Sequence, residues 1–381
     1  MMKFVKRYLS FVVIGAILLV CGAMSMGGSL SPATAYLFEK ISISIILAVS
    51  LGLVVGFLGE LSLGHASFMC VGAYLGGSIS EVLVKALELD GSKNFLVLLL
   101  ALIIGAACAA LCGFIIGLPA LRLRGDYLAI VTLAFGEIVR VIFTNAKLFG
   151  GAQGMATPRF DKKYLFIIGL ALVLATVAIA QNLLRSKHGR AITAIRDNEI
   201  AAKATGINVT KYKLTVFTIS SAFAGIAGVL YSYSNFNVQP SKFGYNYSIE
   251  ILVMVVLGGM GSINGSIIAA ALITYLNTKL PLVLTGELAV LQNLFYALIL
   301  ICIVIYNNAP ALKGFREKYN LRNLFIKIFK PSNDPSKVRD DAARWDVVPT
   351  KIEMNEVLST DVIVDTTGDN SADIGERGGN K

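Results

Sequence analysis

The residues best suited to a specific interaction form a basic, alanine-rich segment, Ser186 to Lys213, between two long apolar runs. Lys and Arg accumulate on the cytoplasmic side of membrane proteins, so this segment is predicted to be cytoplasmic. Its chemistry suits the non-covalent docking of a soluble partner. The segment has six cations: Lys187, Arg190, Arg196, Lys203, Lys211 and Lys213.

A short helix is predicted within the basic segment. Asp197 or Asn198 is placed to cap its start, and Gly206 is a suitable stop. Small side chains let another protein approach closely, and a helix of this kind suits a groove on a partner. One face of the helix carries Ile200, Ala201 and Ala204.

A glycine-rich stretch, Gly56 to Tyr74, lies where two apolar runs meet. It has two interpretations: close helix packing, or a discontinuous helix beside a translocation path. His65 has no second histidine or cysteine at ligand spacing and no nearby acid other than Glu60, so we expect it to make a hydrogen bond rather than bind a metal. The residues of this stretch that we consider candidates for lining a translocation path are Gly59, Ser62, Gly64 and His65.

A second glycine break runs from Val255 to Ile268 and resembles the first only loosely, so it does not establish an internal repeat. It adds Gly258 and Gly261 to the path candidates. Glu137 and Arg140 are three residues apart within an apolar run, where charged groups must pair, face the protein interior or reach water. Spacing alone leaves a self-satisfied pair and a contact to a zwitterionic substrate both open.

The elements that position these residues are transmembrane helices. The chain has 381 residues, of which 55% are hydrophobic and 15% charged, a composition that excludes a soluble domain with one core. We predict an all-α, polytopic transmembrane bundle with discontinuous Gly-rich segments and about ten spans. The apolar runs are Tyr8–Gly27, Ile41–Phe57, Leu63–Val84, Phe95–Gly117, Tyr127–Phe143, Tyr164–Leu184, Leu214–Tyr233, Ile249–Leu257, Ile267–Val283 and Leu288–Tyr306.

Orientation follows from the cations. With the N-terminus inside, the cytoplasmic segments carry twice as many Lys and Arg as the opposite side, which predicts that both termini are cytoplasmic. The first run is interpreted as an uncleaved span. Residues 1–331 are predicted to form the membrane domain, with the cytoplasmic loop at 185–213. Residues 332–381 carry eleven acids against six cations and are predicted to be a disordered tail that is dispensable for transport.

Motifs for catalysis and nucleotide binding are missing from the sequence. Gly-Lys never occurs, so there is no phosphate-binding loop of the GxxxxGK[ST] type, and HExxH, GxSxG and CxxC are absent as well. We therefore predict no catalytic residues, no metal and no enzyme activity. Energy for transport must come from an ion gradient or from a partner ATPase.

Four stretches of the chain resemble, in the same order, the permease subunits of bacterial branched-chain amino acid ABC importers, specifically the M-type member of the H/M pair. The resemblance covers about Gly52 to Asn308. Its four stretches are GELSLGHASF (Gly59–Phe68), LRLRGDYLAIVTLAFGEI (Leu121–Ile138), GGAQG (Gly150–Gly154) and the long stretch that begins HGRAITAIRDNEIAAKATG and ends at Tyr231.

The resemblance implies that the cytoplasmic loop is the coupling loop that contacts ATPase subunits. The loop departs from the family's general pattern in one place. Ile200 stands where the pattern has glutamate, and the glutamate of this chain, Glu199, lies one position earlier. The residues carried over are Arg190, Ala191, Arg196, Asn198, Glu199, Ala201, Ala202 and Gly206.

Partners and location are implied by the same resemblance: two ATP-binding cassette subunits, a sister permease in a heterodimer, a periplasmic or extracellular binding protein, and the lipid bilayer of the bacterial inner membrane. No nucleic acid is expected. The chain itself needs no cofactor, since the ATPase subunits bind ATP. Urea or short amides remain alternative substrates, and an ion-coupled secondary carrier or a polytopic scaffold remains an alternative class.

Overall fold

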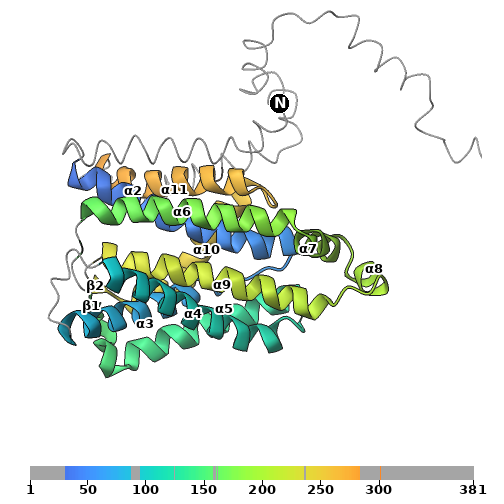
Figure 1. Cartoon of the computed structure of the whole chain (residues 1–381), viewed down its shortest axis with the longest axis horizontal. Coiled ribbons are helices and arrows are strands. Elements are labelled where there is room, and N and C mark those ends of the chain that lie inside the picture. Colours follow the sequence, from blue (N-terminus) through green and yellow to red (C-terminus); the bar gives the residue numbers. More distant parts are fainter. Residues whose placement is uncertain are drawn as a thin grey trace, which may run out of the picture. The chain divides into compact units, whose positions relative to one another are not determined.

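The computed structural model describes residues 31–86, 95–123, 125–157, 160, 162–235, 237–283 and 301. Nearly all of this part is helical, and its elements are shown in Figure 1. The long helices are α2 (Pro32–Gly52), α3 (His65–Ala86), α4 (Phe95–Ala120), α5 (Asp126–Asn145), α6 (Lys162–Arg185), α9 (Val209–Ser234), α10 (Tyr245–Gly258) and α11 (Ile263–Val283).

Short elements join these helices. A π-helical turn, η1 (Leu53–Leu58), continues α2, and two short helices, α7 (Lys187–Asp197) and α8 (Glu199–Ala204), connect α6 to α9. Two-residue strands β1 (Met155–Ala156) and β2 (Asn237–Val238) pair antiparallel, with Met155 opposite Val238. The α7–α8 pair lies at one end of the long helices and the β1–β2 pair at the other (Figure 1).

Two neighbouring groups of helices make up the described part. Helices α3, α4 and α9 pack against one another, and α5 packs on α3. Helix α2 packs against α6, α9 and α11, while α10 packs against α11 and α2. Helix α2 therefore joins the two groups, and most of its residues are buried.

Glycines set the close approach of α3, α4 and α9. A Cβ added at Gly72 of α3 would overlap the backbone of Gly225 in α9, and one at Gly225 would lie 2.7 Å from the Gly105 carbonyl oxygen of α4. Larger side chains at these crossings would push the backbones apart. Small residues serve this purpose in membrane bundles, where lipid is as apolar as the helix surface.

Six helices of the described part are long and apolar enough to cross a membrane, and α10 is a shorter apolar helix. The all-α membrane fold is thus confirmed. Eight of the ten predicted runs fall on the long helices, while Tyr8–Gly27 and, apart from Ile301, Leu288–Tyr306 lie outside the described residues. The count of about ten spans stays a prediction, as do the acidic tail and its boundary after residue 331, which also lie outside this part.

Candidate functional site

The basic loop folds as two short helices, each capped by a polar side chain. Ser186 begins α7, and its Oγ accepts from the amides of His188 at 3.1 Å and Gly189 at 3.3 Å. Asn198 begins α8, and its Oδ1 accepts from the amides of Ile200 and Ala201, both at 3.0 Å. Of the two predicted caps, the structure therefore selects Asn198 over Asp197.

The end of α8 is a left-handed turn at Gly206, whose φ is +83°. A side chain rarely adopts this conformation, which explains glycine as the stop. The added Cβ would meet no atom within 4 Å, so the backbone angle and not crowding selects glycine here.

One face of α8 is open to a partner. Ile200 is 75% exposed, and Ala201 and Ala204 are exposed beside it. The other two alanines of the loop pattern, Ala191 and Ala202, are buried and hold α7 and α8 against the bundle. Arg190 is exposed on α7.

Arg196 ties the loop to the first glycine break. Its Nη1 donates to the Gly56 carbonyl oxygen at 3.0 Å, and the Asp197 carboxylate accepts from its Nε and Nη2 at 3.2 and 3.1 Å. The aliphatic part of Arg196 lies against Gly59, where an added Cβ would come 2.7 Å from the Arg196 Cγ. Gly59 has a φ of +81° and ends the π-helical turn.

The two glycine breaks meet at the same point. A Cβ on Gly56 would lie 2.6 Å from the Gly261 amide nitrogen, and one on Gly261 would lie 3.4 Å from the Arg196 Nη1. We call Gly56, Gly59, Arg196 and Gly261 the break junction. The sequence places these four residues in three separate motifs, but it does not predict that they come together.

A partly buried ion-pair cluster lies beside the break junction. The Lys213 Nζ pairs with Oε1 of Glu60, and it lies 3.2 Å from Oε2 of Glu199. The Lys203 Nζ lies 2.7 Å from the other Glu199 oxygen. The Lys213 side chain is 5% exposed and that of Glu60 11%. We call Glu60, Glu199, Lys203 and Lys213 the ion cluster.

The ion cluster shows what Lys213 and Glu199 contact. Lys213 is the last cation of the basic segment, but α9 begins at Val209 rather than at the apolar run from Leu214, so Lys213 lies within the helix and is buried. Glu199 pairs with two cations rather than facing a partner freely. Glu60 is not among the predicted site residues, although an acid between two apolar runs is itself a signal that it needs a partner.

The remaining candidates of the first break fix its other side. His65 Nε2 and Ser50 Oγ are 2.6 Å apart, which gives the predicted hydrogen bond. Gly64 packs against the Thr132 carbonyl of α5, where no Cβ would fit. Ser62 is buried, and its Oγ has no hydrogen-bond partner among the described residues. The break is therefore anchored to α2 and α5.

Glu137 and Arg140 lie apart from the break junction. The Arg140 Nε donates to Oε2 of Glu137 at 2.7 Å, and Oε1 of Glu137 accepts from the Tyr245 amide at 3.2 Å. The pair thus holds the first residue of α10, whereas Gly258 ends that helix and packs against Gly265 at the start of α11. The geometry satisfies both charges within the protein.

Known proteins match most of this chain. The model of a family described as branched-chain amino acid transport system / permease component matches residues 33–304. The chain is 38% identical over 264 residues to the high-affinity branched-chain amino acid transport system permease protein LivM of Salmonella typhimurium, a match that covers 61% of this chain and 60% of that protein. Thus the match spans less than two thirds of that relative's length.

More distant relatives match a larger share of their own length. The probable branched-chain amino acid transport permease protein LivM of Methanocaldococcus jannaschii is 29% identical over 62% of this chain and 77% of its own length. The ribose import permease protein RbsC of Escherichia coli is 29% identical over 71% of this chain and 84% of its own length. No solved structure matches the chain.

Proposed function

The chain belongs to the family described as branched-chain amino acid transport system / permease component, and from that premise we propose that it is the permease subunit of an ATP-driven importer. It forms half of a translocation path for leucine, isoleucine and valine. A sister permease supplies the other half, two separate ATPase subunits bind ATP, and an external binding protein delivers the substrate.

One observation carries this proposal: the exposed helix α8 is linked, through the adjoining α7, to both glycine breaks. The α8 face at Ile200 and Ala201 is open to a partner, while Arg196 of the adjoining α7 bonds to the Gly56 carbonyl. Lys213 then joins α8 to Glu60, which lies within the first break. A force applied to α8 therefore acts on the backbone at the break.

The break is suited to respond to such a force. The backbone between Leu58 and His65 leaves the helical path, and Gly59 and Gly261 have left-handed φ angles that permit large backbone changes. Hinges in moving proteins are a few loop residues of this kind. ATP-driven closure of the ATPase subunits would shift α8 and reopen the path at the break junction.

The proposal includes a location. The chain is a multi-pass membrane protein, and we place it in the inner membrane with both termini and α7–α8 in the cytoplasm. The excess of Lys and Arg on that side supports this orientation. A secondary carrier would have no use for an exposed docking helix tied to the path.

Reconstitution tests the proposal. The chain, its sister permease and both ATPase subunits are placed in proteoliposomes, the binding protein is added, and uptake of labelled leucine, isoleucine, valine, urea and ribose is measured. We expect branched-chain amino acid uptake that needs ATP and persists when ionophores collapse all ion gradients. Uptake abolished by ionophores would assign an ion-coupled carrier, and uptake of urea or ribose alone would overturn the substrate.

A further inference from the structure

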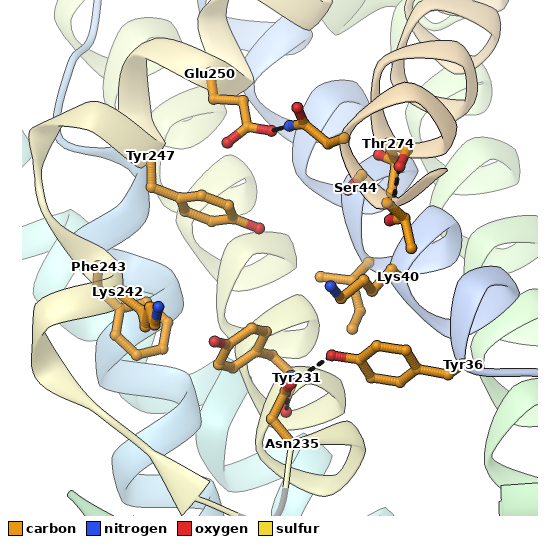
Figure 2. A pocket seen from close by; sticks show the side chains of 13 residues that line it. Tyr36, Lys40, Ser44, Tyr231, Asn235, Lys242, Phe243, Tyr247, Glu250 and Thr274 are labelled. Atoms are coloured by element: carbon orange, nitrogen blue, oxygen red, sulfur yellow. Dashed lines mark hydrogen bonds between the residues drawn. The ribbon is translucent and has the colours of Figure 1, made fainter. Parts of the chain in front are cut away.

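A polar cavity lies at the ends of α2 and α9 opposite the ion cluster. It has a volume of about 360 Å³, within the range of small-molecule sites. In Figure 2, Lys40 of α2, Tyr231 of α9 and Tyr247 of α10 point into one space. The walls come from α2, α9, η4 (Pro240–Phe243), α10 and α11, and include Tyr36, Tyr231, Lys242, Phe243, Tyr247 and Asn277.

The cavity offers separate positive and negative groups. Lys40 lies with its Nζ 4.7 Å from the centre of the Tyr36 ring, and Glu250 lines the same cavity. One oxygen of Glu250 accepts a hydrogen bond from the Asn277 amide. Lys242 is exposed at the wall formed by η4. Ionisable groups within a membrane bundle are costly unless they serve a ligand or pair.

A buried hydroxyl and aromatic walls complete the cavity. Thr274 is 6% exposed, and its Oγ1 has no hydrogen-bond partner among the described residues. Buried polar groups are usually paired, so an unpaired hydroxyl lining a cavity is suited to receive a ligand. The hydroxyl of Tyr36 donates to Asn235 Oδ1 at 2.9 Å, which fixes one wall. The rings of Tyr231, Phe243 and Tyr247 offer apolar surface.

We propose that this cavity binds the zwitterionic head and apolar side chain of an α-amino acid as it enters the path. Lys40 pairs with the ligand carboxylate, and Glu250 pairs with the ammonium group, to which Thr274 adds a hydrogen bond. The aromatic walls hold the side chain. This assignment rests on the proposed import of branched-chain amino acids and identifies where the permease itself contacts them.

The cavity is connected to the break junction by α10. Glu250 lies near the middle of this helix, and the helix ends at Gly258, three residues before Gly261. Helix α2 makes a parallel connection, since Lys40 lies in its first half and η1 follows its last residue. A bound amino acid therefore contacts the same two helices that end at the break.

Direct binding to the purified full chain in lipid nanodiscs tests this site. The probes are labelled leucine, with leucinol, which lacks the carboxylate, and 4-methylpentanoate, which lacks the ammonium group, as competitors. Glu250→Gln and Lys40→Met should each raise the leucine Kd about tenfold or more, as expected for a lost charge-assisted contact. Glu250→Gln should also abolish the preference for leucine over 4-methylpentanoate.

Matched controls come from α3. Glu81 and Lys85 form an ion pair at 2.7 Å with the lysine 73% exposed, and Glu81→Gln and Lys85→Met should leave the leucine Kd unchanged. Thr274→Val removes only the unpaired hydroxyl while keeping the shape of the side chain. It should raise the Kd even if the charge variants fail to fold.

The outcomes separate this site from the proposed function. Absence of leucine binding to the wild-type chain, or pocket variants that bind like the α3 controls, would overturn the site. In that case ATP-driven leucine uptake by the reconstituted complex would leave the proposed importer standing. Absence of that uptake would instead remove the importer itself.

Discussion

At the residue scale, Lys213 connects α8 to the first glycine break. It lies on α9, pairs with Glu60 within the first break, and also reaches Glu199 on α8. Removing one partner from a buried pair leaves an uncompensated charge, whereas removing both leaves none. Stability and coupling can therefore be separated at this position.

The first prediction concerns the stability of this pair. Lys213→Met should destabilise the protein by about 3 to 5 kcal/mol, because Glu60 is left buried without its cation. The double variant Glu60→Gln with Lys213→Met should recover most of that loss. Thermal unfolding of the purified chain measures both effects, with the exposed Lys211→Met as control. Equal melting temperatures for all three would show that the pair contributes nothing.

The second prediction concerns Gly64. An added Cβ would overlap the Thr132 carbonyl, so Gly64→Ala should cost about 1 to 3 kcal/mol and reduce transport, and Gly64→Leu should abolish it. The control is Gly136→Ala on the facing helix α5, where the Cβ would lie 3.7 Å from Gly64 and fits. Thermal stability and uptake measure the difference. A Gly64→Ala protein that matches Gly136→Ala would contradict the packing.

At the element scale, α7 and α8 form one continuous unit that contacts the break junction. Asn198 caps α8 at the point where α7 ends, and Arg196 on the last turn of α7 contacts both glycine breaks. The buried Ala202 keeps α8 against the bundle while Ile200 and Ala201 face outward. In the proposed importer, docking and transmission would thus use opposite faces of the same short helix.

The third prediction tests the docking face. Ala201→Arg places bulk on an exposed face, so the protein should fold and insert normally but bind the ATPase subunits poorly. The control is Lys187→Met, which removes an exposed charge on α7 outside the docking face. Co-purification of the ATPase subunits measures docking. Full recovery of both subunits with Ala201→Arg would show that the partner binds elsewhere.

Local sequence signals predict the positions of these helices well, but they do not predict the tertiary contacts between them. Apolar runs located eight helices, and the cap at Asn198 and stop at Gly206 follow from local chemistry. The apolar runs do not mark where two helices begin. Helices α9 and α10 begin at Val209 and Tyr245, and their first turns are largely polar, so the apolar runs start several residues later. No local signal predicts that Gly56 packs on Gly261, since that contact depends on the tertiary arrangement.

At the whole-molecule scale, the chain carries two polar sites at opposite ends of the same helices. Lys40 and Glu250 at one end were not singled out from the sequence, although charges inside or beside apolar runs offered the same signal that drew attention to Glu137 and Arg140. The break junction and ion cluster lie at the other end. Helices α2, α9 and α10 join the two sites, so a change at one end can alter access at the other.

The central claim is that the ion cluster transmits the action of the ATPase to the path. The most direct test is the number of leucine molecules taken up per ATP hydrolysed by the reconstituted importer carrying the Glu60→Gln with Lys213→Met double variant. We predict that ATP hydrolysis continues while uptake per ATP falls about 5- to 150-fold, the usual range for a lost coupling between sites. Lys211→Met should keep the wild-type ratio. A double variant that folds and retains the wild-type ratio would contradict the account.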